Sequence, residues 1–225
     1  MSDWANQLET LYQCLDFNMK SAMRESTLGE VGADRYPELT GPGIYFVFEP
    51  NELRACGGDR VVRVGIADNL KYRLKQHLAG SSNFLNLVFA ALSHREQHDE
   101  FYAFRNKAWR EIPEPHNSEM RKFNERVICY MKRFRLTWIP IPELRQRIRL
   151  ELWATVLLSN YWYQGADRFD PPSNQWLGYS LPRGVQKADE ERNEKIRRSG
   201  LWSAELVDLD LISGCQLEFR RLVCP

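Results

Sequence analysis

Two short runs of β-branched and aromatic residues, separated by a turn-forming segment, constrain this chain more than any other feature of its 225 residues. The runs are GIYFVF at 43–48 and VVRVGI at 61–66. Both are typical of strands, and the RACGGDR between them has the Gly-Gly-Asp chemistry of a turn. The pattern predicts a hairpin in which Tyr45 and Arg63 are cross-strand neighbours. Gly65 would end the second strand where a side chain would crowd any approaching group.

A helix is predicted directly after this hairpin. Asp68 and Asn69 are good N-cap residues, and LKYRLKQHL continues a helical pattern to about residue 78. Arg73 and His77 are four residues apart, so they share one face of the helix.

The remainder of the chain reads mainly as helices around this unit. Apolar residues at helical spacing predict helices at 3–24, 84–92, 118–134 and 143–162, and a charged helix is predicted at 186–198. The run Leu136–Ile141 reads as a third strand, and Pro140 places it at an edge or marks its end. The Gly- and Pro-rich segment 26–42 predicts a connecting loop.

This pattern indicates one core with additions at both ends. We expect an N-terminal helix and connecting loop at 1–40, a core at 41–175, and a C-terminal extension packed on the core at 176–225. No apolar run approaches the roughly 18–20 residues that a membrane-spanning helix needs, and the first residues lack the pattern of a secretory signal. The expectation is therefore a cytoplasmic protein without a membrane partner.

Charge and cysteine content narrow the function classes. Five widely spaced cysteines with no CxxC pair argue against a disulfide framework and against a zinc ribbon. The net charge is only +1, but residues 121–149 hold 9 Lys and Arg against 2 Asp and Glu. Such a block is expected where one face meets a polyanion, and a solvated helix face accounts for it equally well.

At these positions the sequence resembles the GIY-YIG nuclease superfamily. Gly43–Tyr45 matches the first motif of the family fully, and Arg63–Gly65 matches the second in its hydrophobic and Gly positions. The segment NLKYRLKQH at 69–77 is similar to the NLxxRLxxH helix of the family. The resemblance covers residues 41–175 and continues more weakly to about residue 203 through IRRSGLW.

Two further positions match later parts of the family pattern. Glu151, in RLELWATVLL, stands where the family has its single metal-binding carboxylate. Asn174 ends a DPPSN segment that is similar to the PPxN following that helix in the family, although the intervening loop is longer here. Considered alone, Glu151 is more readily explained as an ion-pair partner of Arg147, and Asn174 as a simple turn residue.

The resemblance implies an α/β fold, in which a small antiparallel sheet of three strands is flanked by helices, with extra helices at both ends. It also implies an endonuclease that uses Mg²⁺ or another divalent cation to hydrolyse phosphodiester bonds of DNA, in restriction, defence or DNA processing. RNA stays open as a substrate. Because one small site must cut two strands, either a homodimer or successive nicks would be needed. The implied catalytic residues are Tyr45, Arg63, Arg73, His77 and Glu151.

The chemistry of hydrolysis explains this choice of residues. Tyr45 would act as general base, but a phenol with an ordinary pKa of about 10 is a poor base unless neighbouring cations favour the phenolate. Arg73 is the obvious cation, and its planar fork also fits a phosphate. His77 would bond a phosphate oxygen or a water. Glu151, as a lone carboxylate, would hold one hard cation such as Mg²⁺.

Arg63 departs from the family, which usually has a Tyr at this position. Our preferred hypothesis is that Arg63 supplies a second positive charge beside Tyr45. The alternative is a catalytically impaired protein that still binds nucleic acid on the same scaffold. A third reading is a protein-interaction module that uses exposed aromatic residues.

Backbone phosphates would be contacted by further polar residues if DNA is the partner. From their position on the predicted helices and on the DPPSN segment, we expect these contacts from Lys71, Lys75, Arg121, Lys122 and Asn174.

Overall fold

A four-stranded antiparallel sheet, in the order β1-β4-β2-β3, forms the centre of the computed structural model. The strands are β1 (Ser26–Thr27), β2 (Gly43–Leu53), β3 (Asp59–Ala67) and β4 (Arg135–Pro140). The α/β class and the small antiparallel sheet are confirmed, with the two-residue β1 as a fourth strand beyond the three expected. The structure describes residues 10, 12–16, 19, 26–36, 39–54, 58–79, 82–104, 108–159 and 170–203.

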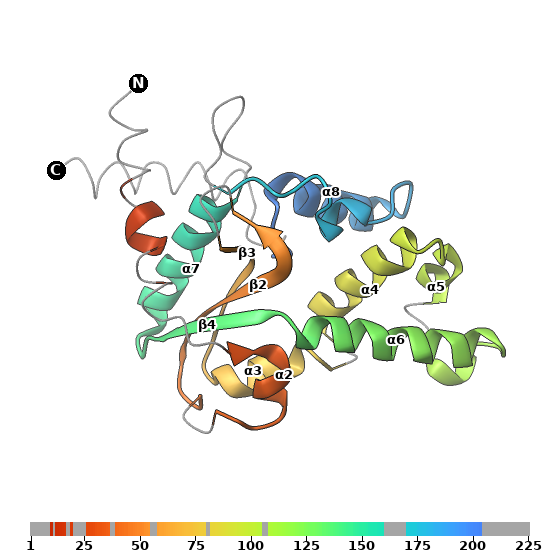
Figure 1. Ribbon diagram of the computed structural model, residues 1–225, viewed down its shortest axis with the longest axis horizontal. Coiled ribbons are helices and arrows are strands. Elements are labelled where there is room, and N and C mark those ends of the chain that lie inside the picture. The colour runs from red at the N-terminus through yellow and green to blue at the C-terminus, as the bar shows by residue number, and fades with distance from the viewer. Residues whose placement is uncertain are drawn as a thin grey trace.

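Helices cover both faces of this sheet (Figure 1). They are α2 (Leu28–Gly32), α3 (Leu70–Gln76), α4 (Asn83–Arg95), α5 (Asp99–Phe104), α6 (His116–Lys132), α7 (Leu144–Leu158) and α8 (Lys187–Ser199). Single 3-10 turns lie at Trp109–Glu111 and Leu177–Ser180. Most of the helix predicted at 3–24 lies outside the described residues. None of the helices in the described part of the chain combines the length and the apolar character that crossing a bilayer demands.

The predicted hairpin of β2 and β3 is present, and its register places the two motif residues. Tyr45 pairs with Gly65, whereas Arg63 pairs with Val47. Tyr45 and Arg63 are therefore diagonal neighbours on one face of the sheet rather than directly opposed. β4 pairs with β2 on the other side and ends at Pro140, so the proline marks a strand end and β4 is an inner strand.

Alternation along β2 divides the core into two clusters. Tyr45 and Val47 face the cluster formed with α3, α4 and α6. Ile44, Phe46 and Phe48 face the other cluster, which includes Ala154, Leu157 and Leu158 of α7. Successive side chains of a strand point to opposite faces, so α7 covers the face of the sheet opposite to Tyr45 (Figure 1).

The loop prediction for 26–42 is wrong in its first part. Thr27 caps α2 through a capping box with Glu30, in which Thr27 Oγ1 accepts from the Glu30 amide and the Glu30 carboxylate accepts from the Thr27 amide. Leu28 and Val31 are buried against the core. A short, well-capped helix that packs at two positions therefore forms in a segment whose Gly and Pro content is typical of a loop.

Candidate active site

The phenol of Tyr45 and the imidazole of His77 form the centre of the site. Tyr45 lies in β2 and His77 directly follows α3, and the Tyr45 hydroxyl oxygen is 2.7 Å from His77 Nε2. Only 1% of Tyr45 and 2% of His77 is exposed. Burial holds the pKa of His77 well below its usual value, and the charges of Arg63 and Arg73 lower it further. At neutral pH the imidazole is therefore uncharged, and Nε2 either accepts a hydrogen bond from the Tyr45 hydroxyl or donates one to the Tyr45 oxygen, according to its tautomer.

Gly65 provides the space that this phenol occupies. A Cβ atom at Gly65 would lie 2.3 Å from the Tyr45 hydroxyl oxygen and 2.5 Å from Cζ of its ring. These separations are far below van der Waals contact, so only glycine fits beneath the ring. The predicted crowding at Gly65 is present, but Gly65 lies within β3, which continues to Ala67, and the crowded group is the ring of its cross-strand partner Tyr45 rather than a group that approaches a turn.

A cavity of about 230 Å³ lies beside the pair and is lined by residues of β3, α3 and the start of α4. Its lining residues are Arg63, Arg73, Gln76, His77, Ser82, Asn83 and Phe84. Two guanidinium groups line this cavity, and none of these residues carries a carboxylate. The charge of the cavity is therefore suited to an anion.

Arg63 is held in place from two sides. Its guanidinium carbon lies 4.9 Å from the centroid of the Phe84 ring, and its Nη1 donates to the Trp202 carbonyl at 3.3 Å. Its Nε is buried and has no hydrogen-bond partner in the described part of the chain. A buried donor without a partner is costly.

Arg73 lies on the exposed side of the same cavity. Its nearest polar contact is a long one, from Nη1 to Gln76 Oε1 at 3.5 Å. The guanidinium is therefore weakly held and can reorient toward a ligand, while Arg63 is fixed. The structure thus brings together four of the five predicted catalytic residues, namely Tyr45, Arg63, Arg73 and His77.

Glu151 does not line this cavity. It lies on α7, which covers the face of the sheet opposite to Tyr45 but also packs against β3, the edge strand that carries Arg63. One turn earlier on α7, the buried Arg147 donates to Asp68 at the end of β3. The sheet thus lies between α7, which carries Glu151, and the face that carries Tyr45, and the catalytic role of Glu151 stays a prediction.

The residues present are compatible with a magnesium ion that the protein holds through a single carboxylate. The described part of the chain holds no group of three or more His, Cys, Asp and Glu side chains that could hold a metal. An all-protein cage is therefore excluded within those residues. Mg²⁺ commonly keeps several waters and binds through one or two carboxylates together with substrate phosphate, which is the chemistry that a lone Glu151 would provide.

The cations predicted to contact phosphates are not equally free. Lys71 and Lys75, on α3, both form ion pairs of 2.8 Å with Asp34. Arg121 stacks on the Trp109 ring at 5.3 Å, and Lys122 is exposed. Arg121 and Lys122 lie in the first half of α6, away from the sheet (Figure 1).

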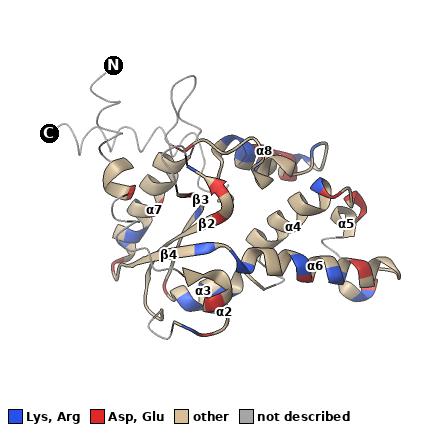
Figure 2. Ribbon diagram, in the orientation of Figure 1, with Lys and Arg blue, Asp and Glu red and all other residues tan. Residues whose placement is uncertain are grey.

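The basic block at 121–149 does not form one face. Its residues are divided among α6, β4 and α7, and Figure 2 shows acidic residues among the basic ones on α6 and α8. Arg135 pairs with Asp59 at 2.9 Å, and Arg147 pairs with Asp68. The charge pattern of the sequence therefore overstates the free positive surface.

Asn174 is not brought to the cavity of Tyr45 and His77. It lines a separate cavity at the far end of β2, together with Glu49, Glu52 and Arg95.

Two residues that support the site were missed. Phe84 stacks on Arg63 and contacts the His77 ring edge-on at 5.4 Å, and the Trp202 carbonyl receives the Arg63 guanidinium. Phe84 reads as an ordinary apolar residue at the start of a helix. Trp202 belongs to the SGLW segment, where the weaker family resemblance was the only available signal.

A family model described as the GIY-YIG domain matches residues 2–223. The chain therefore belongs to the GIY-YIG family, which is in general a family of nucleases. The searches against curated proteins and against solved structures return no significant match.

Proposed function

We propose that this protein is a metal-dependent endonuclease that hydrolyses phosphodiester bonds of DNA. One observation carries the proposal: the buried Tyr45–His77 hydrogen bond stands beside a cavity that two arginines line. Family membership supports the nuclease class. A phosphodiester is the anion that this combination of a proton acceptor and guanidinium groups would serve.

In this proposal Tyr45 takes the proton of the attacking water, and His77 holds Tyr45 in position. The Tyr45 oxygen is hydrogen-bonded to Nε2 of His77, which stays neutral because burial and the charges of Arg63 and Arg73 lower its pKa. As the water oxygen attacks phosphorus, Tyr45 acts as the phenolate and takes the proton of the water. General-base catalysis of this kind contributes about 100- to 10,000-fold to the rate.

The two arginines have different tasks. Arg63 is fixed by Phe84 and by the Trp202 carbonyl, so its unpaired Nε–H is oriented before substrate binds. Arg73 is more loosely held and would close on the phosphate as a planar fork. Oriented donors stabilise the charge that develops on the phosphate oxygens without further reorganisation.

Glu151 would hold the divalent cation, with Mg²⁺ as the expected ion. When bound, such a cation neutralises charge on the phosphate and on the leaving oxygen.

Cleavage of supercoiled plasmid tests the proposal. The purified protein is incubated with plasmid and MgCl2, beside Tyr45→Phe and Glu151→Gln. Tyr45→Phe is expected to lose at least about 100-fold in cleavage rate, because general-base catalysis contributes that much, and Glu151→Gln is expected to lose cleavage because the cation loses its carboxylate. Tyr72→Phe, at an exposed tyrosine of α3, and Glu143→Gln, at the exposed N-cap of α7, are the controls and should cleave like the wild type.

The same assay separates the competing functions. Wild-type protein that binds plasmid in a salt-dependent manner but never cuts it, with Mg²⁺ or Mn²⁺ present, would be the impaired nucleic-acid-binding protein. A protein that binds no plasmid at low salt would favour a protein-interaction module. RNA of the same sequence, tested in parallel, decides between the two nucleic acids.

A further inference from the structure

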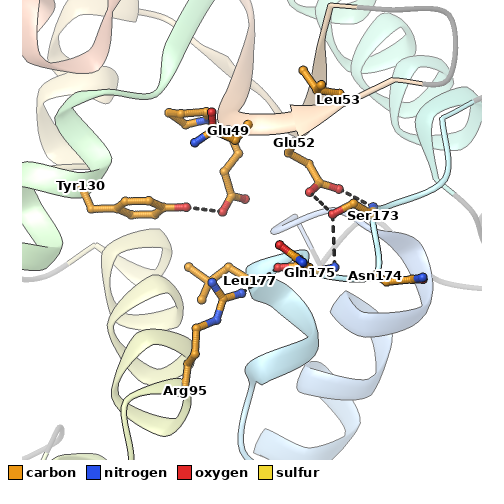
Figure 3. A pocket seen from close by; sticks show the side chains of 11 residues that line it. Glu49, Glu52, Leu53, Arg95, Tyr130, Ser173, Asn174, Gln175 and Leu177 are labelled. Atoms are coloured by element: carbon orange, nitrogen blue, oxygen red, sulfur yellow. Dashed lines mark hydrogen bonds between the residues drawn. The ribbon is translucent and has the colours of Figure 1, made fainter.

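A second and larger cavity lies where β2 ends, and the proposed reaction does not use it. It has a volume of about 590 Å³, within the range of cavities that hold small ligands. In Figure 3, Glu49 and Glu52 approach the cavity from β2, Tyr130 from α6 and Arg95 from α4. Gln175 lies between the two glutamates and Arg95, and Leu53 lies at the end of β2.

The two carboxylates of this cavity are already committed to internal hydrogen bonds. Glu49 accepts from the Tyr130 hydroxyl at 2.6 Å, from Trp176 Nε1 at 3.1 Å and from Trp202 Nε1 at 3.3 Å. Burial raises the pKa of the Glu49 carboxyl group.

The second carboxylate, on Glu52, accepts from Arg60 Nε at 3.0 Å and from both the amide and the hydroxyl of Ser173 at 2.7 Å. Every carboxylate oxygen of Glu49 and Glu52 is thus occupied. The two acidic residues form a rigid wall rather than a set of free ligands.

The uncommitted polar side chains of the cavity are carboxamides. Arg95 donates through Nε to Ser180 and through Nη2 to the Gln175 carbonyl at 2.8 Å. Among the described residues that line the cavity, Asn51, Asn174 and Gln175 are exposed and their side chains have no hydrogen-bond partner. Each carboxamide offers a donor and an acceptor side by side.

We propose that this cavity binds one base of the nucleic-acid substrate, with adenine as the preferred base. A phosphate is disfavoured because two carboxylates and one guanidinium line the cavity. Asn and Gln side chains pair with adenine through two hydrogen bonds, whereas cytosine would need a free carboxylate and guanine a free guanidinium. The identity of the ligand as part of a substrate rests on the proposed nuclease function.

The position of the cavity suits recognition near the cut. Glu49 follows Tyr45 by four residues on the same face of β2, which corresponds to about 13 Å at roughly 3.3 Å per residue. Along B-form DNA this is about four base steps of 3.4 Å. Helix α4 joins the two cavities, because Phe84 at its start lines the first and Arg95 at its end lines the second.

Calorimetric titration with free nucleosides tests the base cavity without any cleavage. Adenosine, cytidine, guanosine and thymidine are the probes, and adenosine 5′-monophosphate tests for a phosphate requirement. Adenosine is expected to bind most tightly, and Gln175→Ala to weaken it by about 5- to 150-fold, the range of one lost two-bond contact. Leu53→Trp should fill the entrance and weaken binding at least as much, because Leu53 is 58% exposed and can be enlarged without disturbing the core.

Leu144→Trp is the matched control, since Leu144 is 53% exposed on α7 and does not line the cavity. It should bind adenosine like the wild type. Three results would each overturn the base cavity. They are the absence of saturable adenosine binding, binding that requires the phosphate of the monophosphate, and adenosine affinities of Gln175→Ala and Leu53→Trp equal to that of the wild type. Plasmid cleavage measured on the same preparations reports on the proposed reaction separately, because adenosine can bind to a protein that does not cut and a protein can cut without binding adenosine.

Discussion

At the scale of single residues, Gly65 and Tyr45 form one unit. The family pattern has a glycine at this position of the second strand, and here the phenol lies where a Cβ atom would stand. We predict that Gly65→Ala lowers the free energy of unfolding by about 1–3 kcal/mol, the usual cost of overpacking, and abolishes plasmid cleavage by displacing Tyr45. Urea denaturation measures the first effect. Gly41→Ala is the control, because a Cβ atom at Gly41 meets nothing within 4 Å.

The buried His77 makes stability depend on pH. Its pKa is lowered well below 6.5 in the folded chain and returns to about 6.5 on unfolding. Below pH 6.5 the unfolded chain therefore binds a proton at His77 that the folded chain does not bind. The contribution of the neutral His77 to the free energy of unfolding is fully present above pH 6.5 and is lost as the pH falls toward the folded pKa.

We predict that the wild-type free energy of unfolding falls between pH 7 and pH 5 by up to about 1.4 kcal/mol per pH unit from this residue. His77→Gln should remove that part of the slope, because glutamine does not titrate. His94→Gln, at an exposed histidine, should keep the wild-type slope. Equal slopes in all three proteins, measured by denaturation at each pH, would contradict the buried neutral state of His77.

Asp34 restrains two of the cations expected to contact DNA. The ammonium groups of Lys71 and Lys75 lower the pKa of the Asp34 carboxyl to about 2, so the carboxylate stays charged under ordinary conditions. We predict that Asp34→Asn strengthens plasmid binding and steepens the plot of log affinity against log salt by up to about 0.9 for each lysine released. Fluorescence anisotropy over 50–200 mM salt measures the slope. A slope equal to that of the wild type in Asp34→Asn would show that these lysines do not reach phosphate.

At the scale of elements, the segment that follows α8 completes the site. The Trp202 amide donates to the Val62 carbonyl at 2.7 Å, and the Ser203 hydroxyl donates to the Val64 carbonyl at 2.9 Å. These bonds cover the outer edge of β3 on both sides of Arg63. The segment thereby protects an exposed strand edge and positions the guanidinium at the same time.

We predict that Trp202→Ala destabilises the protein by about 3–5 kcal/mol, as for other buried aromatic residues, and that it reduces cleavage more than the loss of folded protein explains. The side chain is 1% exposed and donates to Glu49. Trp109→Ala is the control, at a tryptophan that is 37% exposed. Thermal unfolding and cleavage at a temperature where both variants are folded distinguish the two effects.

At the scale of the whole molecule, the expected core at 41–175 depends on both of its extensions. From the N-terminal side, Leu28 and Val31 are buried, and from the C-terminal side Trp176 and Trp202 are each 1% exposed. All four belong to one hydrophobic cluster with Tyr45. The three segments therefore share a core, and we propose that they fold together.

We predict that a fragment of residues 41–175 does not fold on its own, because it exposes the apolar surface that those extensions cover. Near-ultraviolet circular dichroism and urea unfolding of the fragment, beside the full chain, measure this. A sharp, cooperative unfolding transition of the fragment would show instead that 41–175 is an autonomous domain.

Local patterns were sufficient to predict the hairpin and the helix that carries Arg73 and leads to His77. These features depend on residues close together in the chain, where strand alternation and the spacing of a helical turn govern geometry. The short capped helix α2 was missed because two buried contacts outweighed an unfavourable composition.

Only the tertiary structure decided which of these residues meet. The Tyr45–His77 bond joins residues 32 apart, and the contact of Arg63 with the Trp202 carbonyl joins residues 139 apart. The tertiary structure also placed Glu151 on the helix that covers the opposite face of the sheet, and Asn174 at another cavity. Such contacts follow from which faces pack together to bury apolar surface, a property of the whole chain that no local spacing contains.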